Sequence, residues 1–255
     1  MRVELMAAYV LHTRPYRNTS LLVDAFTLGQ GRVLGVAKGA QRARAALQAT
    51  THLFTPLELS WLGASDLKTF TAAHTAGPVR WLQGRAVMSG LYVNELLVKL
   101  LHKGDSHEQL FWRYDRVLHE LASGCDAAVS LRLFEKTVVA EMGFGLCFER
   151  DASSCPLEPT AWYCFDPECG VRVVTAPEIA AASSYRESVP THPAAPFSQA
   201  VTGKTLMDLG RETLSSADAS GEAKRFLGSV IQHCLGDATL QSRLIWRRSV
   251  RPTKG

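Results

Sequence analysis

The chain has 255 residues, of which 46% are hydrophobic and 20% are charged. This length is enough for a full hydrophobic core and for two domains, and the composition is that of a globular protein. No apolar run approaches the roughly 20 residues that a membrane-spanning helix requires. The alternating N-terminal sequence also reaches Arg14 too early for a signal peptide. We therefore expect a cytoplasmic protein with no membrane association.

The formal net charge of +4 is unevenly distributed along the chain. Residues 1–80 contain nine Lys and Arg against four Asp and Glu, and residues 191–255 contain nine against five. The segment between them, residues 81–190, carries ten basic and fifteen acidic side chains. Two basic ends can contact a polyanion, but an imbalance of this size is also common on solvated surfaces.

The first part of the sequence has the pattern of five short strands separated by turn signals. Five strands of this length fit a small barrel, for which the OB-fold is a common solution, and strand count alone does not exclude an SH3-like barrel. The predicted strands cover residues 3–12, 19–28, 32–39, 52–63 and 66–75. Pro15 is expected to separate the first two.

A basic arm of residues 37–48 follows the third predicted strand. It contains Lys38, Arg42 and Arg44 together with Gly39, and it has no acidic residue. Such an arm can be a solvated loop, or it can be the part of a small barrel that contacts a phosphate backbone.

The pattern changes to helical periodicity after Pro78. Amphipathic helices are predicted over residues 87–104, 107–124, 127–145, 198–214 and 222–236. Residues 151–190 interrupt them with five prolines and three cysteines, and this pattern indicates an insertion of turns and short strands. The predicted fold class is therefore α+β, with a five-stranded OB-fold barrel followed by an α-helical domain.

The cysteines of this insertion are poorly spaced for a metal site. Zinc ligands usually come in C-x2-C pairs, but the partner of Cys155 in such a pair would be Glu158, and Cys164 and Cys169 are separated by four residues. A site of three cysteines completed by Glu158 or a histidine remains open. Reduced thiols without a metal are the favoured interpretation, and we expect no cofactor.

Motifs of catalysis are weak in this sequence. The stretch Val201 to Thr205, "VTGKT", resembles the end of a phosphate-binding loop, but Ser198 stands where that loop needs its first glycine. We interpret it as the start of a helix. The histidines form no metal-binding signature, and no serine lies in a G-x-S-x-G motif. The sequence therefore favours a protein that is not an enzyme.

Three stretches, taken in order, resemble the RecO family of bacterial recombination mediators. They are "YVLHTRPYRNTSLLVDAFTLGQGRVLGVAKGA", "LYVNELLVKLL" and "LRLFEKTVVAEMGFGLCFERDASSC", and the similarity extends over residues 1 to about 248. This resemblance implies an OB-fold domain at residues 1–80 and a helical domain at residues 81–150 and 191–248. It also implies a zinc-finger-like insertion at residues 151–190, here with broken ligand pairs, and a basic tail at residues 249–255.

The resemblance further implies a nucleoid-associated monomer that binds single- and double-stranded DNA. It implies annealing of complementary strands coated by single-stranded-DNA-binding protein (SSB), and cooperation with RecR in loading RecA. The expected DNA-binding residues are Arg14, Lys38, Arg42 and Arg44 of the barrel, with a second candidate surface made of Lys224, Arg225, Arg243, Arg247 and Arg248. The matching helix implies that Arg132, beside Phe134 and Lys136, binds the acidic C-terminal tail of SSB.

Two readings from other classes remain open at this stage. An OB-fold protein of this kind could bind RNA or the ribosome, and a preference for RNA over DNA would identify it. A hydrolase with an unrecognised site is the second alternative, and a turnover assay would identify it.

Overall fold

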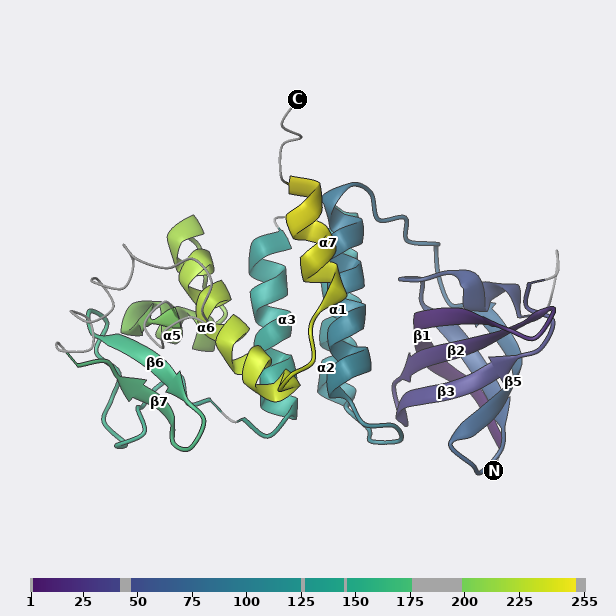
Figure 1. The fold of residues 1–255 in the computed structure, drawn as a ribbon, viewed down its shortest axis with the longest axis horizontal. Coiled ribbons are helices and arrows are strands. Elements are labelled where there is room, and N and C mark those ends of the chain that lie inside the picture. The colour runs from purple at the N-terminus through teal and green to yellow at the C-terminus, as the bar shows by residue number, and fades with distance from the viewer. Residues whose placement is uncertain (1, 42–46, 125–126, 145, 176–198, 251–255) are drawn as a thin grey trace. The chain divides into compact units, whose positions relative to one another are not determined.

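The computed structural model describes residues 2–41, 47–124, 127–144, 146–175 and 199–250, the side chains of residues 247–250 excepted (Figure 1). Two compact units make up the chain. One contains residues 1–127 and 238–255, and the other contains residues 128–237. Within the described ranges, no helix has both the length and the apolar character needed to cross a bilayer.

A closed five-stranded barrel forms the N-terminal part of the first unit (Figure 1). The strands follow one another around the barrel in the order β1-β2-β3-β5-β4. β3 pairs with β5 in parallel, and the other neighbours are antiparallel. The strand bounds are β1 (Arg2–Tyr16), β2 (Ser20–Thr27), β3 (Gly31–Ala37), β4 (Leu57–Leu62) and β5 (Leu67–Thr75), with the 3₁₀-helix η1 (Gln48–Thr51) between β3 and β4. This closed barrel confirms the predicted OB-type fold.

One strand differs from its predicted bounds. β1 continues through Pro15 to Tyr16, and Pro15 is paired with Leu21 in the β1–β2 ladder. A proline lacks one N–H donor, and at the end of a strand this costs at most one ladder bond. The interruption expected at Pro15 therefore does not occur.

Alternating residues of the strands fill the interior of the barrel. Val23 and Ala25 of β2 are fully buried there, and Trp61 of β4 lies edge-on to Phe70 of β5 with ring centroids 6.3 Å apart. A Cβ atom at Gly35 would approach the Phe70 ring to 2.5 Å, so this position in β3 accommodates the ring only because it carries no side chain.

The barrel and three helices belong to the same unit. These helices are α1 (Arg85–Leu100), α2 (Glu108–Ala122) and α7 (Gln241–Val250). The rings of Tyr9 and Phe26, on the outside of the barrel, pack against Phe111 and Tyr114 of α2 with centroids 5.0 to 5.9 Å apart. Aromatic pairs at these separations stabilise a contact beyond the area that they bury.

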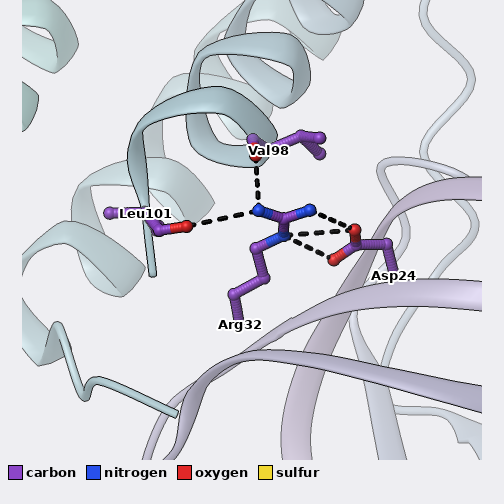
Figure 2. A network of polar contacts seen from close by, with 4 residues as sticks. All are labelled: Asp24, Arg32, Val98 and Leu101. Carbon is purple, nitrogen blue, oxygen red and sulfur yellow. Dashed lines mark hydrogen bonds and ion pairs between the residues drawn. The ribbon is translucent and has the colours of Figure 1, made fainter. Parts of the chain in front are cut away.

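Arg32 of β3 joins the barrel to the end of α1 (Figure 2). Its guanidinium forms a paired contact with the Asp24 carboxylate, with nitrogen–oxygen distances of 2.7 to 3.1 Å. It also donates to the backbone carbonyls of Val98, at 2.5 Å, and Leu101, at 3.2 Å. A cation at the C-terminal end of a helix satisfies carbonyls that lack intrahelical partners and opposes the negative end of the dipole.

The second unit combines three further helices with a small sheet. The helices are α3 (Ala127–Glu141), α5 (Gly203–Gly210) and α6 (Ala217–Leu235), and the strands β6 (Trp162–Asp166), β7 (Gly170–Val173) and β8 (Val201–Thr202) pair in the order β7-β6-β8. α5 begins at Gly203, and the Thr202 side chain accepts a hydrogen bond from the Thr205 N–H as its N-cap. This confirms the interpretation of "VTGKT" as a helix start.

Two aspartates shape the turns that flank β6 in this unit. Asp151 Oδ1 accepts the N–H groups of Ser153 and Cys155, each at 2.9 Å. Asp166 Oδ1 accepts those of Glu168 at 2.8 Å and Cys169 at 3.3 Å. Short acidic side chains stabilise tight turns in this way, because they satisfy successive backbone donors.

Candidate nucleic-acid interface

A groove of about 520 Å³ lies on the barrel, at the end where β1 passes into β2. Residues from the β1–β2 hairpin, from the end of β3 with its following turn and from the start of β5 line it. Nucleic acids bind OB barrels on the face of the second and third strands and on the loops between strands 1 and 2 and strands 4 and 5. The groove therefore occupies the part of the barrel from which this fold binds its ligands.

Three cations and no acidic residue line the described groove. They are Arg17 of the hairpin, Lys38 after β3 and Lys68 at the start of β5, and Arg17 and Lys38 are exposed. None of the three forms an ion pair with a carboxylate among the described residues. Unpaired cations gathered in a hollow attract an anion, because their charges add and the surrounding protein screens them less than bulk water does.

Apolar and hydroxyl-bearing side chains share the groove with these cations. Tyr16, Val36 and Leu67 provide apolar surface, and 43% of Leu67 is exposed to solvent. Thr19, Ser20 and Thr69 add hydroxyl groups that can donate to a phosphate or a base. This combination can accommodate an anionic chain that also carries flat apolar groups.

Two residues that line the groove have a left-handed backbone conformation. Arg17 has a φ of 54°, a left-handed conformation that costs a residue with a side chain about 1 kcal/mol. Gly39, which follows Lys38, has a φ of 71° and adopts the same region without that cost. The hairpin therefore holds Arg17 in a defined turn, and a side chain at position 39 would strain the turn after β3.

The predicted barrel residues have different outcomes. Lys38 lines the groove. Arg14 is exposed on β1, two residues before Tyr16, so alternation along the strand places both on the same face. Arg42 and Arg44 lie outside the described residues. Tyr16, Arg17 and Lys68 were not identified as site residues from the sequence. Arg17, after β1, and Lys68, at the start of β5, could have been proposed as DNA contacts from their position beside the loops with which OB barrels bind ligands.

The second predicted basic surface is divided between the two units. Lys224 and Arg225 are exposed on α6 of the second unit, and Arg243 lies on α7 of the first. Arg243 is half-buried, and it donates to the Tyr92 hydroxyl at 3.1 Å with its guanidinium 5.3 Å from the centre of that ring. Of Arg247 and Arg248, only the helical backbone is described.

The three residues predicted for the SSB tail lie on α3. The Arg132 guanidinium is buried, with only 5% of its side chain exposed, and it pairs with the Glu135 carboxylate at 2.7 Å. Phe134 is fully buried. Lys136 donates to the carbonyl of Gly210 at 2.9 Å, at the end of α5. Arg132 and Lys136 therefore both have intramolecular partners.

The cysteines of the insertion lie in different environments. Cys155 and Cys169 are exposed in their turns, whereas Cys164 is buried in β6. Desolvation, followed by the nearby Asp166 carboxylate, raises the pKa of the Cys169 thiol. Across the described ranges, no group of three or more potential ligands is arranged to hold a metal ion.

An OB-type barrel whose groove is basic and, in its described lining, free of acidic residues is typical of the class of nucleic-acid-binding proteins. The chain matches the model for the N-terminal part of recombination protein O over residues 1–79 and the model for its C-terminal part over residues 82–244. It therefore belongs to the RecO family of DNA repair and recombination proteins.

Individual relatives agree with this assignment over nearly the whole chain. The chain is 38% identical to the DNA repair protein RecO of Thiobacillus denitrificans, over 96% of this chain and 92% of that protein. It is 40% identical to the RecO protein of Nitrosococcus oceani, over 95% of this chain and 92% of the relative. The corresponding protein of Nitrosospira multiformis is 37% identical, with 95% and 94% covered.

Proposed function

We propose that this protein binds DNA through the groove of its barrel and acts in homologous recombination by binding rather than by catalysis. The observation that carries the proposal is the cluster of Arg17, Lys38 and Lys68 in a groove whose described lining has no acid. Membership of the RecO family supports DNA as the polyanion.

The mechanism of binding is electrostatic and independent of sequence. Each cation that meets a phosphate releases a condensed counterion, so the affinity falls as the salt concentration rises. Three contacts give a slope of roughly −2 in a plot of log affinity against log salt for a single strand. Arg14, on the same face of β1, and Arg42 and Arg44, which follow the groove in the sequence, would extend this basic path.

Substitution of the basic arm tests the proposal. A variant with Lys38→Ala, Arg42→Ala and Arg44→Ala should bind all DNA sequences more weakly, and its salt slope should flatten by up to about one unit per lost contact. Lys204→Ala, an exposed lysine of α5 that does not line the groove, is the matched control. A salt slope that is unchanged in the triple variant would contradict the role of the arm.

The second basic group is proposed as an additional DNA contact. Lys224 and Arg225 are exposed on α6, and Arg243, Arg247 and Arg248 belong to α7. Arg243 already contacts Tyr92, so its substitution would also remove an intramolecular contact. The double variant Lys224→Ala with Arg225→Ala is therefore the better test of this surface. We expect a smaller loss of affinity from this pair than from the arm.

We further propose, from the family resemblance, that the protein anneals SSB-coated complementary strands and helps RecR to load RecA. The protein would act as a monomer in the cytoplasm, at the nucleoid. Annealing of two labelled SSB-coated strands, with and without the protein, is the direct test. Competition between DNA and RNA of the same sequence tests the alternative of an RNA- or ribosome-binding protein, which a preference for RNA would support.

The proposed contact of Arg132 with the acidic SSB tail requires the guanidinium to change partner. At present Arg132 pairs with Glu135 inside α3, and removing one member alone would leave the other charge buried. The double variant Arg132→Met with Glu135→Gln removes both charges together. It should bind a labelled tail peptide more weakly than the wild type while its affinity for bare DNA stays unchanged. Thermal melts must show that it folds, and equal peptide affinities would remove Arg132 from the site.

A further inference from the structure

The Tyr16 ring stands at the end of β1, where the groove is lined by both charged and apolar side chains. The ring is half-buried, and the Arg17 guanidinium lies over it, 5.4 Å from the ring centre. Because the ring lines the groove and is only half-buried, part of it is open to a planar group that enters the groove.

Val36 and Leu67 add apolar side chains to the lining of the same groove. Val36 of β3 is in register with Thr69 of β5, and Leu34 is in register with Leu67, so these side chains belong to adjacent strands. Single exposed apolar residues are common on protein surfaces. Here they line the same groove as three cations, and a ligand that consisted only of phosphates would leave this apolar area unused.

Single strands and duplexes would use such a groove differently. A duplex presents its phosphates outward and keeps its bases stacked inside, so it meets the cations and not the apolar surface. A single strand can turn its bases toward aromatic side chains, and stacking of one base on an aromatic ring is worth about 1–3 kcal/mol. The cations therefore contribute to both ligands, whereas an aromatic platform contributes only to one.

We propose that Tyr16 is a base-stacking platform that makes the groove prefer single-stranded over double-stranded DNA. This inference rests on the proposed function, because it assumes that the groove binds DNA. A base stacks on the Tyr16 face that Arg17 now covers, and the exposed Arg17 side chain moves to an adjacent phosphate. The exposed Leu67 side chain offers further apolar surface in the same groove.

The test compares a single-stranded oligonucleotide with a duplex of the same length, titrated against the full chain at fixed salt. Tyr16→Leu keeps an apolar side chain without the ring, and it should weaken single-strand binding by about tenfold. Its affinity for the duplex should change less than twofold. Tyr16→Phe keeps the ring and should bind as the wild type does. Equal losses for both ligands, or no loss with Tyr16→Leu, would overturn the proposal.

Lys68→Ala separates failure of this inference from failure of the proposed function. It removes a cation of the groove and should weaken both ligands alike, with a reduced salt slope for each. If Lys68→Ala has this effect while Tyr16→Leu does not discriminate, only the stacking role is wrong. If neither variant nor the basic-arm variant changes binding, the groove is not the DNA site and both proposals fail.

A second measurement needs no variant protein. A single strand with abasic sites keeps its phosphates and loses its bases, so it should bind the wild-type protein about as weakly as the duplex does. An abasic strand that binds as tightly as the intact strand would overturn the stacking role, whether or not Tyr16→Leu folds.

Discussion

Asn94 shows how one buried polar side chain connects three elements. Its Nδ2 donates to the Leu11 carbonyl of β1 at 2.9 Å, and its Oδ1 accepts the Tyr114 hydroxyl of α2 at 2.7 Å. Its neighbours in the "YVNELL" stretch have similar roles, since Tyr92 contacts Arg243 and Glu95 contacts α7. This stretch, which carried part of the family resemblance, therefore holds the first unit together.

Replacement of Asn94 should be costly for stability. Asn94→Ala removes a donor from the Leu11 carbonyl and an acceptor from the Tyr114 hydroxyl, and we expect a loss of about 2–3 kcal/mol in the free energy of unfolding. Asn18→Ala, in the exposed β1–β2 hairpin, is the matched control and should change it by less than about 0.5 kcal/mol. Denaturant titrations measure both, and similar values for the two variants would contradict this role.

Two helices have N-terminal ends that are capped by a carboxylate from another helix. Glu95 of α1 caps α7, because its carboxylate accepts the N–H groups of Gln241 at 2.7 Å and Ser242 at 2.8 Å. Glu222 of α6 has the same role at the junction of β8 and α5. Its Oε2 accepts the Thr202 N–H at 3.1 Å and the Thr205 hydroxyl at 2.8 Å. These carboxylates satisfy donors that have no partner within the helix.

The Glu222 contacts should make stability depend on pH in the acid range. Desolvation alone would raise its pKa, but the hydrogen bonds from Thr202 and Thr205 outweigh it, and the pKa is lowered below its usual 4.5. A lowered pKa means that the stabilisation is present above about pH 4.5 and is lost as the pH falls through the folded-state value. Glu222→Gln should therefore destabilise the protein by about 1 kcal/mol at pH 7, since partial exposure screens the charge.

The pH series supplies the control for this prediction. The difference in free energy of unfolding between the wild type and Glu222→Gln should shrink as the pH falls from about 4.5 through the lowered folded-state pKa of Glu222, because protonation of Glu222 then makes it neutral like Gln. Chemical unfolding of both proteins from pH 7 to pH 3 measures it. A difference that stays constant over this range would show that the Glu222 charge is not involved.

The turns of the insertion should not depend on a metal. Asp151 and Asp166 satisfy the turn N–H groups that thiolates bound to zinc would otherwise accept. We expect the purified protein to contain no stoichiometric zinc, and a chelator should leave its melting temperature unchanged. Elemental analysis measures the metal, and about one equivalent per chain would show this prediction to be wrong, since a structural site binds one ion.

At the scale of the whole molecule, the barrel and its neighbouring helices share one core. Tyr9 is 2% exposed and Phe26 is fully buried, although both lie on the outside of the barrel, because Phe111 and Tyr114 of α2 cover them. The two family models meet near residue 80, but these contacts and the Arg32 network cross that boundary. The boundary between the two family models therefore does not separate two independently packed parts of the first unit.

A fragment of residues 1–80 should consequently be unstable. It would expose Tyr9 and Phe26, at a cost of roughly 1.5–3 kcal/mol for each ring, and the sum is comparable with the total stability of a small domain. We expect the fragment to bind a hydrophobic dye and to lack a cooperative thermal transition. The full chain is the reference, and a cooperative melt of the fragment within a few degrees of it would contradict the shared core.

The sequence by itself determined the elements and the class of fold. Alternating apolar residues indicated the five strands, and the 3.6-residue period indicated the helices other than α7, because these patterns depend only on neighbours along the chain. It also indicated Lys38 as part of a basic arm, and the combination of three stretches indicated the family.

Only the tertiary structure decided which side chains share a site. Tyr16 and Arg17 lie at the end of β1 and Lys68 at the start of β5, and the pairing of β1, β2, β3 and β5 brings them to the groove of Lys38. Conversely, the family resemblance implied that Arg132 binds the SSB tail, and the structure buries its side chain against Glu135. Helical spacing identifies the residues on a face but does not show what covers that face, because burial depends on elements that are distant in the sequence.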